Sequence, residues 1–159
     1  MSIGVFPAFL FTHCDILGKR QSGGFYMIST KGRYALRVMI DIAENSDGSY
    51  VPLRDIAARQ DISKKYLESI GKELVNGGLL TAASGRSGGY KLSRAPGDYK
   101  ISEILELMEG TLAPVACLRQ NAAPCPWAQD CKTLPMWQEY YEQTMAFFDS
   151  RTLSDLTVL

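Results

Sequence analysis

The hydrophobic positions of this chain recur at helical spacing in several separate segments. The first segment, 29–45, places its apolar residues on one face of a helix. A second, short helix is predicted after Pro52, and a third over 64–76, with Ser63 as its N-cap. Two helices joined by a tight turn are typical of a helix-turn-helix.

A hairpin pattern follows the third helix. Residues 79–83 form a strand candidate, 84–89 a glycine-rich turn and 90–92 a returning strand. Together these elements predict a mainly α fold: a winged helix-turn-helix with a small β-hairpin wing. Further along, a cysteine-bearing loop and a long C-terminal helix complete the expected architecture.

The C-terminal third begins with a fourth helix, which Ser102 is expected to cap and Gly110 to end. Residues 111–132 show no periodicity and are predicted to be a loop. The last helix is expected to open at Thr133 and to end near Asp149.

An apolar, strongly aromatic stripe runs along that last helix. It consists of Leu134, Trp137, Tyr141, Met145 and Phe148. Such a stripe is usually core within one chain. Because the winged helix already has a core of its own, we favour pairing of this helix in a homodimer, whose two-fold symmetry would match a palindromic operator.

Length and composition limit the domain organisation. A chain of 159 residues with 46% hydrophobic and 21% charged residues suits one core with a small appended element. We expect a DNA-binding unit at 27–97, a linker helix and cysteine sensor loop at 98–132, and a dimerisation helix with its tail at 133–159. We expect translation in the native host to start at Met27, so that residues 1–26 are untranslated leader read as protein. The alternative is a disordered N-terminal arm.

The apolar run in this first segment is too short to span a membrane and lacks the flanks of a secretory signal. The sequence therefore predicts a cytoplasmic protein without a membrane association.

Net charge is zero, but it is unevenly distributed. Residues 27–97 carry eleven basic and seven acidic side chains, whereas 98–159 carry four basic and nine acidic ones. The basic half coincides with the predicted winged helix, which favours double-stranded DNA as partner. An ordinary solvated helix face, or a winged helix that binds protein, are the alternatives. The residues predicted to contact DNA are Lys31, Arg33, Ser63, Lys64, Lys65, Tyr66, Glu68, Ser69, Lys72 and Arg86.

Three cysteines, Cys117, Cys125 and Cys131, crowd into the predicted loop. Soft thiolates suit iron–sulfur clusters and zinc, and the absence of paired CxxC motifs argues against zinc. A thiol redox switch, or cysteines without a ligand role, remain as alternatives. An enzyme is disfavoured because the chain has no acid–base constellation and its single histidine is His13.

The sequence resembles the Rrf2 family of bacterial winged-helix transcription factors. The resemblance covers 27–157 and lies in five places: residues 29–36, 51–57, 63–67, the wing at 85–90, and 152–156, together with the cysteine loop. It implies a homodimeric regulator, expected to be a repressor, with a 2Fe–2S or 4Fe–4S cluster on Cys117, Cys125 and Cys131. It also admits a metal-free regulator controlled by thiol oxidation or by a metabolic-enzyme partner.

The fourth ligand departs from the family pattern. Members that regulate iron–sulfur biogenesis have a histidine where this chain has Leu134, and members that sense nitric oxide have an acidic residue where it has Arg33. Asp130, another carboxylate, an exogenous thiol or water are the alternatives expected for that position.

Overall fold

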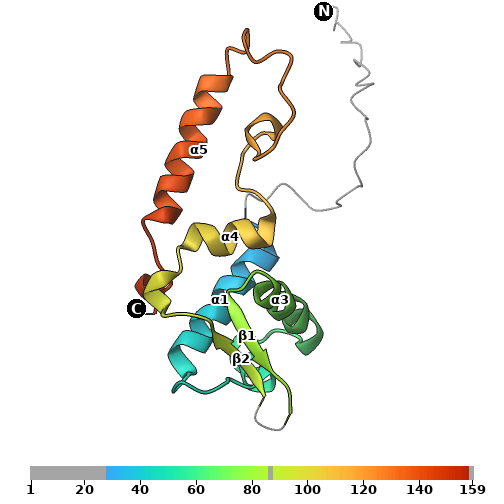
Figure 1. The fold of residues 1–159 in the computed structure, drawn as a ribbon, viewed down its shortest axis with the longest axis vertical. Helices are drawn as coiled ribbons and strands as arrows, with labels where there is room; N and C mark the ends of the chain where they lie inside the picture. The colour runs from blue at the N-terminus through green and yellow to red at the C-terminus, as the bar shows by residue number, and fades with distance from the viewer. Residues whose placement is uncertain (1–27, 86–87, 158–159) are drawn as a thin grey trace, which may run out of the picture.

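The computed structural model describes residues 28–85 and 88–157, which form five α-helices and one two-stranded antiparallel sheet (Figure 1). The elements are α1 (Thr30–Asn45), α2 (Leu53–Gln60), α3 (Lys64–Asn76), β1 (Leu80–Ala83), β2 (Gly89–Leu92), α4 (Ile101–Glu109) and α5 (Leu134–Asp149). Short 3-10 turns lie at Pro96–Asp98, Ala116–Leu118 and Ser154–Leu156. The predictions for 1–26 and for Arg86 fall outside the described residues.

The first three helices begin and end where their capping residues predict. Ser29 caps α1 by accepting a hydrogen bond from the Gly32 amide, and Ser63 caps α3 by accepting one from the Tyr66 amide. Between α2 and α3, Asp61 adopts the left-handed conformation with φ 52°, which reverses the chain within a few residues. The predicted helix-turn-helix is confirmed at this point.

The wing is an antiparallel hairpin in which Leu80 pairs with Leu92 and Ala83 with Gly89. Tyr90 also exchanges backbone hydrogen bonds with Val51, so the segment before α2 extends the sheet by one isolated bridge. The ring of Tyr90 lies against α3 at Gly71, where an added Cβ would collide with it. This contact explains a glycine in the interior of a helix, which by propensity alone costs about 1 kcal/mol relative to alanine.

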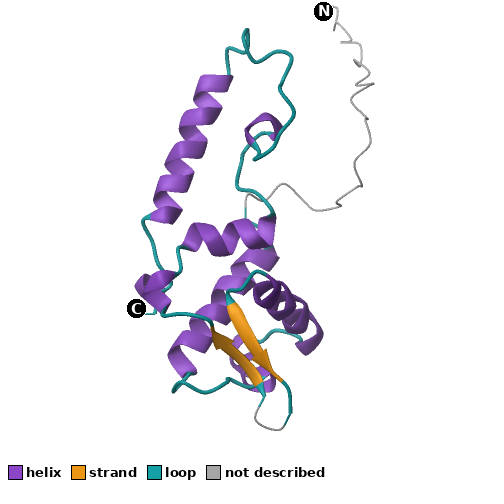
Figure 2. Cartoon of the chain, viewed as in Figure 1, coloured by secondary structure: helices purple, strands orange, loops and turns teal. Residues whose placement is uncertain are grey.

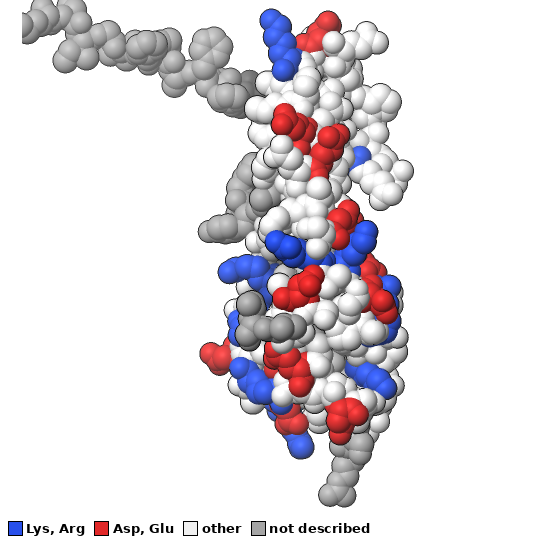
Figure 3. Space-filling view, turned by 90° about the vertical axis from the view of Figure 1, so that its left-hand side faces the viewer, with Lys and Arg blue, Asp and Glu red and all other residues white. Residues whose placement is uncertain are grey.

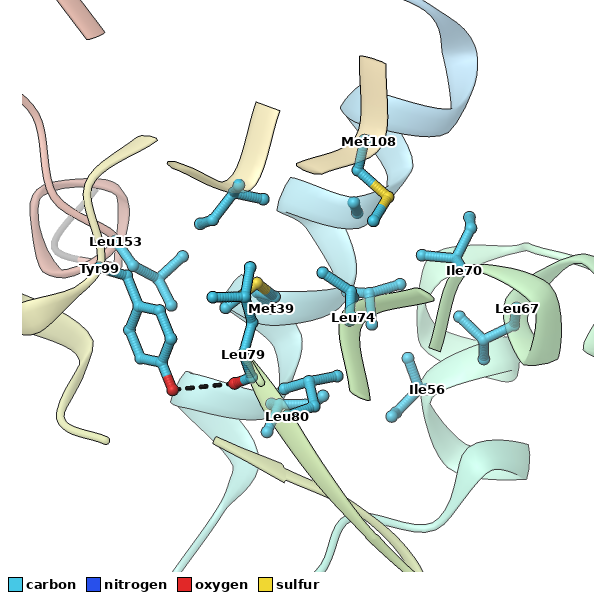
Figure 4. Close-up of a cluster of buried hydrophobic side chains, with 14 of the residues drawn as sticks. Met39, Ile56, Leu67, Ile70, Leu74, Leu79, Leu80, Tyr99, Met108 and Leu153 are labelled. Atoms are coloured by element: carbon cyan, nitrogen blue, oxygen red, sulfur yellow. Dashed lines mark hydrogen bonds between the residues drawn. The ribbon is translucent and has the colours of Figure 1, made fainter. Parts of the chain in front are cut away.

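Side chains from α1, α3, β1, α4 and the C-terminal tail meet in one core (Figure 4). Tyr99 is fully buried, and its hydroxyl donates to the Leu79 carbonyl oxygen at 2.9 Å while accepting from the Arg94 amide at 2.9 Å. These bonds satisfy a polar group that would otherwise be costly to bury. The core therefore joins the wing to the chain that leads into α4.

The predicted cap of the fourth helix is wrong. Lys100 occupies the N-cap position of α4 without a side-chain cap, and Ser102 lies inside the helix, buried. Its hydroxyl donates to Asp149 Oδ1 at 2.5 Å. A carboxylate at the end of α5 thus uses the hydroxyl that the sequence pattern assigns to the helix end, because tertiary packing brings the two elements together.

The helix α5 stands clear of the winged helix for most of its length, and a long loop with one short 3-10 turn connects it to α4 (Figure 2). None of the five residues of the predicted dimerisation stripe is among the large apolar side chains that α5 leaves exposed. Tyr141, Met145 and Phe148 pack against the core of the same chain, as the intramolecular alternative expects. The large apolar side chains that α5 leaves exposed lie on another face of this helix: Met136, Tyr140 and Phe147, with 53%, 39% and 57% of their surface accessible.

No helix in the described part of the chain is long and apolar enough to cross a membrane.

Candidate DNA-binding face and cysteine pocket

The exposed face of α3 carries half of the ten side chains predicted to contact DNA. All of them are solvent-accessible: Lys64, Lys65, Glu68, Ser69 and Lys72. Since residues three and four apart share a helix face, this set covers the outer side of α3 while its apolar residues point into the core. The geometry is that of a recognition helix in a helix-turn-helix.

Three other predicted DNA contacts have partners within the protein. Lys31 Nζ lies 2.9 Å from Glu73 Oε2, an ion pair that joins α1 to α3. Tyr66 is half-buried, and its ring meets that of Tyr34 edge-on with centroids 5.9 Å apart. Arg33 is exposed and donates to Thr30 Oγ1 at 3.2 Å. Of these three, Arg33 is the side chain best placed to reach a phosphate.

A shallow hollow of about 400 Å³ lies between the start of α2, the start of α3 and the wing. Arg54 and Lys64 line it from the helices, and Gly85 and Gly88 line it from the wing. Sequence reasoning missed Arg54, although its place in the first turn of the first helix of the helix-turn-helix could have indicated it. Its partner is Asp55, at 3.2 Å, in an exposed pair that a phosphate could replace.

Basic side chains do not form an unbroken patch on the face drawn in Figure 3. Lysine and arginine side chains alternate there with acidic ones over the winged helix, and charged groups are sparser along the C-terminal part. On the face drawn, therefore, the excess of basic residues in 27–97 is not gathered into one patch.

The cysteine loop brings its three thiols around one pocket of about 260 Å³. Cys117 is the middle residue of the 3-10 turn Ala116–Leu118, Cys125 lies between two prolines, and Cys131 precedes α5. All three are free thiols, with Cys117 exposed and the other two half-buried. The rest of the lining consists of Leu118, Ala122, Ala123, Pro124, Ala128, Leu134 and Gln138.

Cys131 is hydrogen-bonded in a way that favours its thiolate form. The Thr133 side chain lies 3.5 Å from its Sγ, and hydrogen bonding from that hydroxyl and from the Thr133 amide lowers the pKa of Cys131. Since the thiolate is both the metal ligand and the nucleophile, Cys131 is prepared for either role.

The lining of the pocket also shows which residues lie close enough to the cysteines to be considered as a fourth ligand. Leu134, at the place of the expected histidine, lines the pocket, whereas Asp130 does not. Within the described residues, no group of three or more His, Cys, Asp or Glu side chains is arranged to hold a metal ion as it stands. The thiols thus surround a common space, and the loop would have to close for them to ligate one centre.

Comparison with known proteins adds an independent line of argument. The model of the Rrf2 family, described as iron-dependent transcriptional regulators, matches residues 28–158. The HTH-type transcriptional regulator IscR of Klebsiella pneumoniae is 33% identical over 129 residues, covering 81% of this chain and 78% of that protein.

Two solved structures are similar throughout the described fold. CymR, the global cysteine regulator of B. subtilis, superposes with a TM-score of 0.66 at 32% identity, over 82% of this chain and 95% of that one. IscR of T. potens gives a TM-score of 0.60 at 29% identity, over 81% and 84%. These likenesses confirm the winged-helix fold predicted from the hydrophobic pattern.

Proposed function

Because the chain belongs to the Rrf2 family of transcriptional regulators, we propose that it is a cytoplasmic, homodimeric repressor whose DNA affinity is set by an iron–sulfur cluster, 2Fe–2S or 4Fe–4S. Cys117, Cys125 and Cys131 would hold the cluster. The observation that carries this proposal is the common pocket that these three free thiols line.

The donor set fits the group. Thiolate sulfur is the ligand that iron–sulfur clusters use, and the lining between the cysteines is apolar except at one residue, which limits competing polar ligands. A bound cluster supplies an iron centre that responds to oxygen, nitric oxide and iron supply. The chain itself contributes three free thiols on one loop, and one of them, Cys131, has a lowered pKa.

The route from this loop to the DNA-binding unit runs along α5. Cys131 and Thr133 lie directly before its first turn. Its last turn is held on α4 through the bond between Ser102 and Asp149, and the Ile101 amide donates to the Arg151 carbonyl oxygen at 3.0 Å. Since a helix transmits displacement as a rigid element, closure of the loop would shift α4, which packs on α1. In a dimer the same shift would change the spacing of the two α3 helices.

We propose that the dimer forms on the exposed apolar face of α5, made by Met136, Tyr140 and Phe147. An apolar face of this kind on a projecting helix is typical of a surface covered in the assembled protein. A second copy of this chain is the occupant we propose, because a two-fold pair of recognition helices matches a palindromic operator.

The DNA proposal is tested with the chain's own promoter fragment. Binding is measured by fluorescence anisotropy over a series of salt concentrations, for the wild type, Lys65→Ala and the control Lys132→Ala in the cysteine loop. Loss of one phosphate contact lowers affinity and reduces the salt slope by about 1. We expect that change for Lys65→Ala alone. An unchanged slope would exclude Lys65 from the interface.

The cluster proposal is tested by purification without oxygen. A brown protein with stoichiometric iron and sulfide is expected, and Cys125→Ser should lose both, whereas Gln129→Ser on the same loop should keep them. A colourless wild type that binds its promoter normally would overturn the proposal.

A second candidate function rests on the three free thiols that line one pocket, of which Cys131 has a lowered pKa. In a metal-free regulator, a peroxide would oxidise Cys131 and a second thiol of the pocket to a disulfide, with the two protons and two electrons reducing the peroxide. Peptide mass mapping after peroxide treatment tests it: a reversible disulfide within 117–131 that changes DNA affinity supports the switch, and its absence in a colourless protein opposes it.

A further inference from the structure

One polar side chain other than the cysteines lines the cysteine pocket. Gln138 reaches it from α5, whereas every remaining lining residue is leucine, alanine or proline. In a pocket whose other side chains are thiols and hydrocarbon, an amide is the one group able to act as an oxygen ligand.

The position of Gln138 on α5 relates it to the missing ligand. Leu134 occupies the place where the similar regulators of iron–sulfur biogenesis have a histidine, and it lines the same pocket. Gln138 lies four residues further along, one helical turn, so both side chains project on the same face. The longer glutamine side chain, with three rotatable bonds, extends from this second turn back toward the loop, as side chains on a helix lean toward its N-terminus.

The amide of Gln138 is also uncommitted. It makes no hydrogen bond to any described residue, and its side chain is exposed at the mouth of the pocket. Another glutamine on the same helix behaves differently, because Gln143 Nε2 donates to Glu139 Oε1 at 3.1 Å. Gln143 is therefore a matched control that has the same chemistry but does not line the pocket.

We infer that Gln138 is the fourth protein ligand of this site: its amide oxygen takes the coordination position that Cys117, Cys125 and Cys131 leave open on the cluster. The inference rests on the proposed function. An amide oxygen binds iron more weakly than imidazole or thiolate, so this position exchanges readily with an incoming small molecule. Gln138 would thus occupy the position at rest and give it up to an incoming ligand.

The test uses the full-length chain, loaded with iron and sulfide without oxygen, as the wild type, Gln138→Ala, Gln138→His and the control Gln143→Ala. Iron and sulfide content, the Mössbauer spectrum and the rate of iron release to a chelator are measured. Even the loss of an outer-shell partner of a metal ligand typically weakens metal binding about 10- to 100-fold. We expect Gln138→Ala to bind the cluster through its three thiols but to release iron at least about ten-fold faster, with an altered spectrum at one iron site.

Gln138→His should slow release, and its reduced cluster should show nitrogen hyperfine coupling from the imidazole. Gln143→Ala should match the wild type throughout. A Gln138→Ala protein with the spectrum and release rate of the wild type, or Gln138→His without nitrogen coupling, overturns the inference and leaves the cluster proposal intact. A wild type that takes up neither iron nor sulfide overturns both.

Discussion

Thr133 determines the chemistry of Cys131 at the scale of a single residue. It occupies the N-cap position of α5, yet its side chain makes no cap bond and lies instead beside the Cys131 sulfur. The hydroxyl therefore stabilises a thiolate in preference to a backbone amide. The contact between Thr133 and Cys131 therefore links the acidity of one thiol to the start of α5, the helix that connects the pocket to the rest of the molecule.

Replacement of Thr133 by valine removes the hydroxyl and keeps the shape of the side chain. Because hydrogen bonding from Thr133 lowers the pKa of Cys131, its loss raises that pKa and leaves less thiolate at neutral pH. The rate of alkylation of Cys131 by iodoacetamide, followed by mass spectrometry, should shift to higher pH in Thr133→Val. Cys117 in the same protein is the reference, and an equal shift at both cysteines would contradict this role.

Asp41 is the one acidic side chain that the described core buries, with 1% of its surface exposed. It accepts hydrogen bonds from Arg59 Nε at 2.9 Å and from Gln60 Nε2 at 2.9 Å, and a further one from the second nitrogen of the Arg59 guanidinium. These bonds fix the end of α2 against α1. A buried carboxylate satisfied in this way holds the helix-turn-helix in position.

Asp41→Asn cannot accept all of these bonds and leaves a buried donor facing a guanidinium. We expect a loss of about 1–3 kcal/mol in the free energy of unfolding, measured by urea denaturation. Asp55→Asn, which breaks the exposed pair with Arg54, should change it by less than about 0.5 kcal/mol. Equal effects of the two variants would show that burial of Asp41 does not matter.

At the scale of elements, the wing and α3 are locked together by a glycine and a tyrosine. Tyr90 of β2 fits over Gly71, and burial of its ring, reinforced by the negative charge of Glu68, raises the pKa of Tyr90. The wing therefore has a fixed orientation relative to the recognition helix, as simultaneous contact of both with DNA would require.

Gly71→Ala should destabilise the wild type by about 1–3 kcal/mol, because the new methyl group displaces the tyrosine ring. In a Tyr90→Ala background the same substitution should stabilise the protein by up to about 1 kcal/mol through helix propensity. Urea denaturation of the four proteins of this double-mutant cycle measures the coupling. The same sign in both backgrounds would contradict the explanation.

At the scale of the whole molecule, α5 has one side on the protein's own core and another exposed. Tyr141, Met145 and Phe148 occupy the first side, and the exposed apolar face lies roughly 120° around the helix, given 100° per residue. The division means that one helix can anchor itself and still offer an interface. The residues that fold α5 onto its own chain are therefore different from those proposed to pair two chains.

Phe147→Glu places a charge at the most exposed aromatic position of α5 in the described chain. If this face pairs two copies, the dissociation constant of the dimer should rise at least about ten-fold, measured by sedimentation velocity. Ala146→Glu, which adds the same charge about 100° around the helix, should have a smaller effect. Unfolding midpoints of the two variants should stay close to that of the wild type. A dimer equally stable in Phe147→Glu would place the interface elsewhere.

The helices, the wing and the cysteine loop were all predictable from local signals. Caps such as Ser63, the glycine-rich turn and apolar spacing are properties of neighbouring residues, and they decide where elements begin and end. Three things were not predictable in this way. The partner of Ser102, the partner of Tyr90 and the face of α5 that stays exposed all depend on contacts between residues far apart in the chain.

The sequence by itself determined a winged helix-turn-helix followed by three thiols and an aromatic helix, because periodicity, capping and thiol chemistry are written in residue types and short spacings. The tertiary structure decided which side chains serve the core and which serve a site. Only packing could place Gln138 beside the three cysteines, or turn the stripe on α5 toward the core and leave another apolar face exposed, because the direction of a helix relative to its neighbours comes from the sum of many distant contacts.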